Sequence, residues 1–426
     1  MGEDPRKERA MRETAARIDR MILSRRELLK KGGLGLVAVG AVPALLAACG
    51  GGGDGGTTTV AEEPAATAPA TTAAEEPATT AEAVVPPASG TIDFLSWEGY
   101  DLPDPMKAWK QENGVKIQPT YIGNHNDIEA KLKASGNAEG YDLITYYQGF
   151  KPLYAELQIL SPIDPTKIPN LAGLFPFFAS DERNFWVDPD GTRTGVPWTF
   201  GSQGIQYDEA AIPDPPTSWD ILLDPKYKGK VVVVDDTAGN FALGSHILGY
   251  DAGALTPDQF EEVKDYLSQV IAQTKGVAPS YGDYTTRFAS GDVVLGFLGW
   301  QAVNTFAKDA GKDTVKMSFP DEGGSSFCDS YAIPPGADNV DTVDAWINEV
   351  LDPQVHAAAA EYLVGGVTVE DAVQYLSPEV AAFYPYDTLD ELVAKFPFYN
   401  NPPVESDEFI TFEEARTAWE DLKAGA

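Results

Sequence analysis

Two stretches of alternating strand-like and helix-like segments constrain the fold of this chain most strongly. In the first stretch, residues 91–97, 115–121 and 141–146 have the pattern of strands, and residues 104–113 and 127–134 have helical spacing between them. Strands that alternate with short helices are typical of parallel sheets in α/β proteins. The first stretch therefore predicts one α/β unit.

A second α/β unit is predicted between residues 230 and 301. Residues 230–234 (KVVVV) form the continuous β-branched run of a strand buried on both faces. Thr256, Pro257 and Gln259 are the N-cap, first and third positions of a helix with an apolar stripe, and residues 292–299 read as another strand. Residues 385–403 are expected to be irregular, and 405–423 to form a final helix. Two such units predict two lobes with a cleft between them.

The N-terminus has the order of elements of an export signal. Residues 24–30 (SRRELLK) read as a twin-arginine signal through Arg25 and Arg26, and the charge-free run 32–48 has the length of a signal core. Residues 46–49 (LAAC) predict lipid attachment at Cys49. We therefore expect a signal peptide over 1–48 and a protein exported to the periplasm or the outer face of the cytoplasmic membrane. A short membrane anchor or an ordinary signal peptide are the alternatives.

Residues 49–90 are predicted to be a disordered tether. After Cys49 the chain is dominated by Gly, Thr, Ala, Pro and Glu, without an aromatic residue, Lys or Arg before residue 91. Such a segment cannot bury enough apolar surface to offset the entropy of ordering. The folded part is therefore expected over 91–426.

The charge balance excludes some partners. The chain has 65 acidic and 31 basic residues and a net charge of −34. Nucleic acid and anionic membrane surfaces would repel it, whereas a cationic solute would be attracted. A role of the acidic surface in solubility is the alternative for most of these carboxylates.

Enzyme chemistry has little support in the sequence. Motifs for acyl transfer, phosphate binding, dinucleotides or a zinc protease are absent. Beyond Cys49 the only cysteine is Cys328, and His125, His246 and His356 lie far apart in the sequence. We therefore expect neither a metal nor a cofactor, and no catalysis.

The ends of the predicted strands are aromatic and acidic. In open α/β sheets ligands lie beyond the carboxyl ends of the strands. Side chains at those ends are Trp97, Glu98, Tyr100, Tyr147, Gln148, Asp236 and Trp300. Only one of Asp235 and Asp236 should face the cleft, because neighbours on an extended chain point to opposite sides. Carboxylates neutralise ammonium groups, and aromatic faces pack methylenes and attract cations. This set predicts a site for a small organic cation, in particular a polyamine.

From residue 92 to 423 the chain resembles the periplasmic spermidine/putrescine-binding proteins of bacterial ABC importers. The most specific segment is 217–230 (TSWDILLDPKYKGK), followed by 231–234 (VVVV), Asp235 and Asp236. Further matches are 94–97 (FLSW), 141–143 (YDL), 322–324 (EGG) and 329–334 (DSYAIP). The resemblance implies a monomeric, two-lobed periplasmic-binding-protein fold of type II. It also implies that the protein delivers its solute to the membrane permease of an importer.

The resemblance also assigns roles to single residues. Trp97, Tyr100 and Trp300 match aromatic walls of the family's site, and Asp236 and Asp329 match its carboxylates. Phe327 stands where the polyamine binders have a Trp. Two positions depart from the family pattern: Gly99 and Gly239 occupy places where a Glu is expected. Fewer acids mean fewer partners for ammonium groups, so a smaller cation or a zwitterion such as an amino acid or betaine is an alternative solute.

The same resemblance predicts how the chain is divided. One lobe is expected over 91–198 and 302–368 and the other over 199–301 and 369–426, with crossings near 196–198 and 300–301. Single residues suggest two further alternatives. Cys328 next to Asp329 suggests a thiamine-cleaving enzyme on the same fold, and the pair Tyr146 and Tyr147 suggests a ferric-ion receptor.

Overall fold

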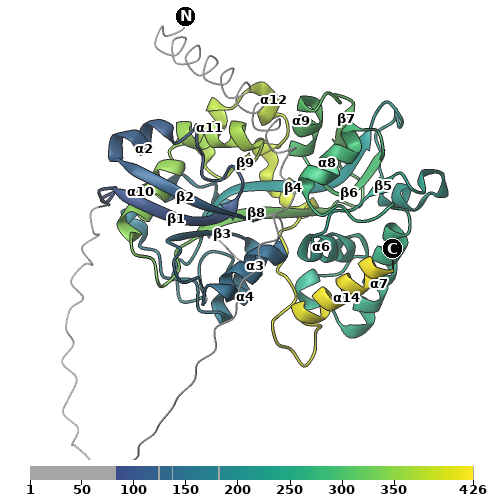
Figure 1. Ribbon diagram of the computed structural model, residues 1–426, viewed down its shortest axis with the longest axis horizontal. Helices are drawn as coiled ribbons and strands as arrows, with labels where there is room; N and C mark the ends of the chain where they lie inside the picture. Colours follow the sequence, from purple (N-terminus) through teal and green to yellow (C-terminus); the bar gives the residue numbers. More distant parts are fainter. Residues whose placement is uncertain (1–82, 123–124, 137, 181–182, 426) are drawn as a thin grey trace, which may run out of the picture. The chain divides into compact units, whose positions relative to one another are not determined.

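The computed structural model describes residues 83–122, 125–136, 138–180 and 183–425 (Figure 1). The signal peptide with Arg25 and Arg26, the lipidation site Cys49 and most of the predicted tether lie outside the described residues. Within them, no helix combines the length and the apolar character needed to cross a bilayer. Residues 83–426 form one compact unit.

Nine strands form one mixed sheet in the order β2-β1-β3-β8-β4-β6-β5, with β7 and β9 paired to β4. The strands are β1 (Gly90–Trp97), β2 (Val115–Ile122), β3 (Leu143–Tyr147), β4 (Val196–Asp208), β5 (Val231–Val232), β6 (Leu295–Trp300), β7 (Val315–Ser318), β8 (Ser325–Ala332) and β9 (Gly366–Val367). Pairing is parallel between β1 and both β2 and β3, and between β5 and β6. The predicted parallel units are therefore present at the two ends of the sheet.

The middle of the sheet is antiparallel, which the alternation pattern did not predict. β8 pairs with β3 and β4, and β4 pairs with β6, in antiparallel fashion. In Figure 1 strands β4 and β8 run through the centre of the described unit and join its two ends. All 13 residues of β4 are buried, so neither face of the strand is exposed to solvent.

The helices are α2 (Lys107–Asn113), α3 (His125–Ala134), α4 (Lys151–Glu156), α5 (Pro176–Ser180), α6 (Thr237–Ile247), α7 (Pro257–Ile271), α8 (Tyr281–Ala289), α9 (Ala302–Asp309), α10 (Val340–Val350), α11 (Pro353–Leu363), α12 (Pro378–Ala381), α13 (Leu389–Lys395) and α14 (Phe412–Ala424). The start of α7 is as predicted: Thr256 and Gln259 form a capping box, and Pro257 is the first helical residue.

Three boundaries differ from the sequence-based expectation. Residues 231–234 are all buried, but only Val231 and Val232 lie in the ladder, and Val234 forms an isolated bridge with Ala278. The last helix begins at Phe412, because Thr411 caps it with Glu414 in a capping box. The segment 385–403 contains α13 and is not irregular throughout.

Two hydrophobic cores lie on either side of the central strands. The first includes Leu95, Ile144 and Phe150, and the second includes Val232, Leu267 and Phe297. Val303, Ala307 and Val315 pack in the second core. By their packing, α9 and β7 therefore belong with the second core. The sequence-based division instead placed residues 302–368 in the lobe of the first core. The lobe boundaries remain a prediction.

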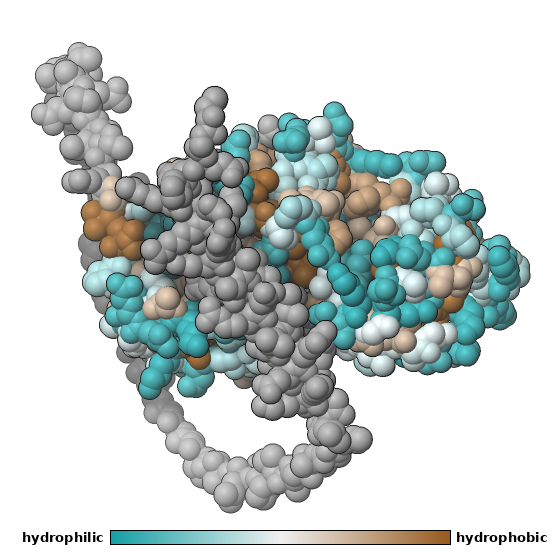
Figure 2. Space-filling view, turned by 90° about the horizontal axis from the view of Figure 1, so that it is seen from above, coloured by the Kyte–Doolittle hydropathy of each residue, from teal (hydrophilic) through white to brown (hydrophobic). Residues whose placement is uncertain are grey.

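The last residues of the predicted tether are attached to the folded unit. The backbone N–H of Val84 donates to the carbonyl of Thr166 at 3.0 Å, and that of Ser89 donates to Thr342 Oγ1 at 3.0 Å. Over the face of the described unit in view in Figure 2, hydrophilic residues cover much of the surface and apolar residues form smaller patches between them. This agrees with the acidic composition of the chain.

Candidate functional site

The ends of β1 and β3 meet the middle of β8 at the candidate site. Trp97 is the last residue of β1, and Tyr147 is the last residue of β3. In the antiparallel register, Tyr147 lies opposite Asp329 of β8. Because side chains alternate along a strand, Phe327 and Asp329 share one face of β8 and Cys328 lies on the other. Three elements far apart in sequence thus supply one cluster.

Asp329 is a buried carboxylate at the centre of this cluster. Its residue is 4% exposed, and the hydroxyl of Tyr100 donates a hydrogen bond to its Oδ2. Burial raises the pKa of Asp329 to about 6, and the charge of Asp236 adds to the rise, whereas the Tyr100 hydrogen bond and His125 oppose it. The Tyr100 ring stands edge-on to Trp198 at 4.7 Å between ring centroids. A cation beside Asp329 would therefore be stabilised strongly, because the carboxylate has little water around it.

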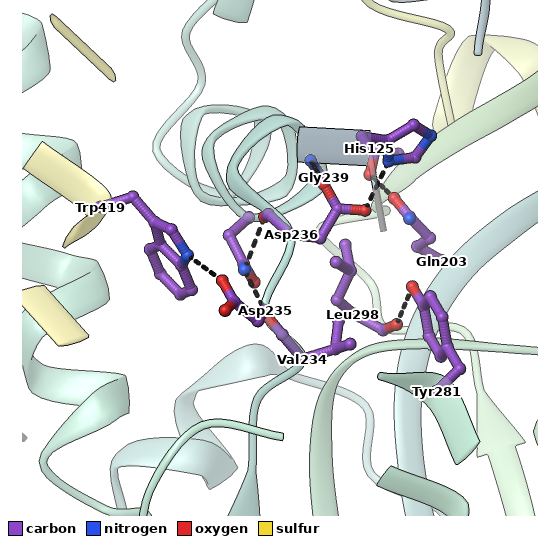
Figure 3. Close-up of polar contacts among 11 residues, drawn as sticks. His125, Gln203, Val234, Asp235, Asp236, Gly239, Tyr281, Leu298 and Trp419 are labelled. Atoms are coloured by element: carbon purple, nitrogen blue, oxygen red, sulfur yellow. Dashed lines mark hydrogen bonds and ion pairs between the residues drawn. The ribbon is translucent and has the colours of Figure 1, made fainter. Parts of the chain in front are cut away.

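Asp236 is the second buried carboxylate, and it caps helix α6. Its Oδ1 accepts the backbone N–H of Gly239 at 3.0 Å, and its Oδ2 lies 3.0 Å from His125 Nδ1 (Figure 3). Burial works against ionisation, but the charge and hydrogen bond of His125 and two backbone N–H groups outweigh it and lower the pKa of Asp236. The helix N-terminus also favours the ionised form.

Asp235 points away from Asp236, as strand alternation predicts. Its carboxylate accepts the indole N–H of Trp419 at 2.8 Å (Figure 3). The same carboxylate pairs with Lys423 Nζ at 3.0 Å. Asp235 therefore attaches α14 to the strand end, and Asp236 alone of the two faces the site.

Aromatic side chains surround the two carboxylates. Trp300 and Phe327 contact each other edge-on at 5.4 Å, and Tyr281 lies 6.3 Å from Trp300. Burial, together with the charges of both Asp236 and Asp329, raises the pKa of Tyr147 and Tyr281. His125 connects the two acids in space: its Nδ1 lies 3.0 Å from Asp236 Oδ2, and its ring lies 5.5 Å from that of Tyr147, which is opposite Asp329 in the sheet. The arrangement suits an organic cation, with acids for its charge and rings for its carbon atoms.

Two predicted site residues have other surroundings. Glu98 is exposed, whereas Tyr100, Tyr147 and Asp329 are buried. Gln148 is buried, but its amide is occupied by the main chain: Nε2 donates to the carbonyl of Tyr399 at 3.2 Å, and Oε1 accepts the N–H of Cys328 at 2.6 Å. Its geometry is that of a residue that positions β8 and not of one that contacts a solute.

His125 and Tyr281 were not predicted to belong to the site. His125 follows the end of β2 at Ile122, so the strand-end rule would have found it had it been applied to that strand. Tyr281 is the first residue of α8, and its hydroxyl donates to the carbonyl of Leu298 at 3.1 Å (Figure 3). Only its neighbour Ser280, a helix N-cap, signals in the sequence that a helix begins there.

The two glycines that replace expected glutamates have structural reasons. Gly99 has φ +90°, and a Cβ there would lie 3.3 Å from the Tyr362 ring. At Gly239 a Cβ would lie 2.7 Å from Leu298 Cδ2, and Leu298 is itself buried with φ +61°. A longer side chain at either position would require neighbouring groups to move. The packing of this chain therefore fits glycine and not the two glutamates that the family pattern expects.

The site centre is closed in this conformation. Tyr147, Asp236 and Asp329 are 5%, 6% and 4% exposed. A separate cavity of about 730 Å³ lies elsewhere, lined among others by Phe175, Tyr386 and Glu391, and it contains none of the predicted site residues. A solute could reach the two carboxylates only after the surrounding elements move apart. Binding of a solute by the predicted residues remains a prediction.

Comparison with known proteins places this geometry in context. The sequence model of the family of bacterial extracellular solute-binding proteins matches residues 106–383 of this chain. The spermidine/putrescine-binding periplasmic protein of Escherichia coli is 28% identical over 294 residues, which cover 69% of this chain and 82% of that protein. The putrescine-binding periplasmic protein PotF of E. coli is 28% identical over 308 residues, covering 68% and 81%. The structure of the Tp0655 (TpPotD) lipoprotein of Treponema pallidum is similar with a TM-score of 0.66 at 20% identity, covering 79% of this chain and all of that one.

Proposed function

The chain belongs to the bacterial extracellular solute-binding proteins, and from this premise we propose that its solute is a small organic cation of the polyamine class. Members of the family work as the substrate-binding component of an ABC transporter together with its membrane subunits. The chain has the two-lobed fold of these periplasmic binding proteins. The identity of the solute is the proposal, because a fold of this kind accommodates many ligands.

The observation that carries the proposal is the pair of buried carboxylates inside an aromatic enclosure. Asp236 and Asp329 are both nearly inaccessible to water, and each influences the pKa of Tyr147 and Tyr281. Two buried acids at one centre repel each other, as the raised pKa of Asp329 reflects. An ammonium group removes that cost, and each contact with an aromatic face adds about 0.5–2 kcal/mol.

The names of the relatives support the same class of solute. Spermidine and putrescine are what the E. coli relatives are named for. With Gly99 and Gly239 in place of two glutamates, this chain has fewer acids than the pattern of the polyamine-binding proteins. The close packing around both glycines disfavours a larger side chain there. A diamine such as putrescine therefore fits the carboxylate pair better than a longer triamine, which would have one ammonium without an acid.

Two other functions are disfavoured by geometry. Cys328 is fully buried, and its Sγ lies 3.7 Å from the backbone carbonyl of Asp329 on the face of β8 away from the site, so we propose no thiol chemistry and no enzyme activity. Tyr146 and Tyr147 diverge: the hydroxyl of Tyr146 donates to the carbonyl of Phe185 at 3.0 Å and that of Tyr147 to the carbonyl of Tyr399 at 3.3 Å. They do not form a shared iron site.

We also propose that the protein is exported by the twin-arginine route and anchored by lipid on Cys49. The support is the order of the SRRELLK segment, the apolar run and the LAAC box in the sequence. Replacement of Cys49 by Ser should release the protein from the membrane fraction and leave solute binding unchanged.

A thermal-shift screen of the purified protein tests the proposed solute class. Putrescine, cadaverine, spermidine, spermine, amino acids and betaines would each be added in excess. A solute at a hundred times its Kd stabilises the protein by about 2.7 kcal/mol. We expect a shift with putrescine that is lost in Asp329→Asn. A shift with betaine or an amino acid and none with any polyamine would discard the polyamine and retain the transport role.

A further inference from the structure

His125 occupies the surroundings that an ammonium group of the solute would need. It is the first residue of α3, and its Nδ1 lies 3.0 Å from Asp236 Oδ2. Its ring lies 5.2 Å from that of Trp97, 5.5 Å from that of Tyr147 and 5.3 Å from that of Phe150. A carboxylate and an aromatic enclosure are what a cation binds. Here they surround a side chain of the protein itself.

The pairing of His125 with Asp236 is electrostatically favourable and rests on one hydrogen bond in the described part of the chain. Burial acts against the charged imidazolium, but the Asp236 carboxylate and its hydrogen bond, with a smaller effect of Asp329, outweigh burial and raise the pKa of His125. The side chain is 15% exposed, and Nε2 has no hydrogen-bond partner among the described residues. Within the residues that the structure describes, one hydrogen bond, to Asp236, holds the ring, so its displacement breaks one polar contact together with the ring contacts to the surrounding aromatic side chains.

Resting on the proposed function, we propose that His125 is an internal competitor for one of the two ammonium positions of the site. In the empty closed protein the imidazolium neutralises Asp236, which leaves Asp329 as the carboxylate without a cationic partner. A diamine must displace His125 to use both acids, whereas a monoamine can bind at Asp329 alone. His125 thus sets how many positive charges the site accepts, and it makes that choice depend on pH.

Proton linkage gives the direction of the pH effect. A displaced His125 returns to an ordinary pKa of about 6.5, below its raised value in the empty protein. Between these two values, binding of a diamine releases a proton, so its affinity rises about tenfold per pH unit. Above the raised pKa the histidine is neutral and no longer competes as a cation.

The other groups that face His125 do not reproduce this behaviour. Tyr147 stays protonated throughout, since its pKa is raised. In the wild type Asp236 stays ionised, because the charge and hydrogen bond of His125, with two backbone N–H groups, lower its pKa against burial. Asp329, with a pKa of about 6, titrates at the lower edge of the window in the wild type, and loss of the His125 charge moves its pKa upward in a His125 variant. Butylamine, which uses Asp329 alone, reports the proton exchange of Asp329 separately in both proteins. Trp97 and Phe150 do not titrate.

Isothermal titration calorimetry of the purified protein with putrescine tests the proposal. Wild type and His125→Asn are compared from pH 6 to 9 in buffers of different ionisation enthalpy, with butylamine as the single-charge control. We expect His125→Asn to bind putrescine about tenfold or more tightly at pH 7, without the proton release of the wild type, and butylamine to bind both equally. Equal or weaker putrescine binding by His125→Asn, or no proton release by the wild type, overturns the proposal.

A second measurement separates this proposal from the proposed solute class. If putrescine binds neither protein, the polyamine assignment fails, and NMR titration of His125 in the empty protein decides whether the internal pair exists. We expect an elevated pKa that returns to the ordinary value in Asp236→Asn. A His125 that titrates at about 6.5 in the wild type, or identically in both proteins, overturns the competitor role.

Discussion

The carboxylate of Asp329 is maintained at a cost to stability in the empty protein. Its pKa is raised from 3.8 to about 6 because it is buried beside Asp236. A raised carboxylate pKa means that the contribution to stability is complete below pH 3.8 and is lost as the pH rises through 6. A bound cation would offset this loss, which is how a binding site commonly trades stability for affinity.

Asp329→Asn should therefore stabilise the empty protein and abolish its function. At pH 8 the variant is expected to gain up to about 3 kcal/mol, because about two pKa units of unfavourable ionisation are removed. The gain should vanish near pH 4, where the wild-type carboxyl is also neutral. Denaturant unfolding at both pH values checks this, with Asp371→Asn, an exposed carboxylate, as the matched control. A variant less stable than the wild type at pH 8 would contradict the burial argument.

Among single residues, the sequence identified the acids and rings but not their partners. Trp97 and Tyr147 could be found because they end strands, and Asp236 because it follows the predicted strand 230–234. The structure brings the three residues together around His125. The pairing of His125 with Asp236 could not be found, because it joins residues 111 positions apart. The same holds for Gln148, whose hydrogen bonds to the Tyr399 carbonyl and the Cys328 N–H depend on the paths of distant segments.

Among the secondary-structure elements, His356 connects α11 to the end of α10 and the residue after β9. Its Nδ1 lies 2.9 Å from the carbonyl of Val350 and donates to it, and Nε2 accepts the N–H of Thr368 at 3.0 Å. The second bond needs the neutral ring, because only an unprotonated Nε2 can accept a hydrogen bond. Burial lowers the pKa of His356 to about 4, and the hydrogen bond to Val350 only partly opposes this.

Acidification should consequently weaken the wild type through His356. A depressed pKa gives stability that is present above about 6.5 and is lost as the pH falls toward 4. The difference in pKa corresponds to about 3 kcal/mol at most. His356→Gln should lose less stability between pH 7 and pH 4 than the wild type, as followed by chemical unfolding. An identical acid sensitivity of His356→Gln and the wild type would refute the assignment.

Elements with a local signal were predicted well, and elements without one were missed. The capping box and the apolar stripe fixed α7, because both are contained in its own residues. β4 was not predicted: it is buried along its whole length and carries Pro197, Gly201 and Gly204, so it shows neither alternation nor strong strand propensity. Its place is determined by pairing with four other strands.

At the level of the whole molecule, the two cores meet across the site through α6 and α14. Ala238 of α6 and Phe412 of α14 pack in the first core, while Phe241 and Trp419 of the same helices pack in the second. The Phe412 ring contacts Phe150 edge-on at 5.3 Å. These contacts belong to the closed conformation, and we expect them to separate before a solute enters.

Solute binding should thus shift the protein toward the closed conformation described here. We expect a smaller radius of gyration in small-angle X-ray scattering when putrescine is saturating, and slower amide exchange at the start of α6. Asp329→Asn should show neither change at the same putrescine concentration. An unchanged radius of gyration in a wild-type sample that binds putrescine would contradict closure.

The central claim is that Asp236 and Asp329 together hold the charges of one small diamine. Titration calorimetry of putrescine at pH 8 into the wild type, Asp236→Asn and Asp329→Asn tests it most directly. Loss of a buried partner of a charge typically costs about 3–5 kcal/mol, so we predict one site per wild-type chain and a loss of affinity of at least about a hundredfold in each variant. Putrescine binding that is unaffected by both substitutions would contradict the account.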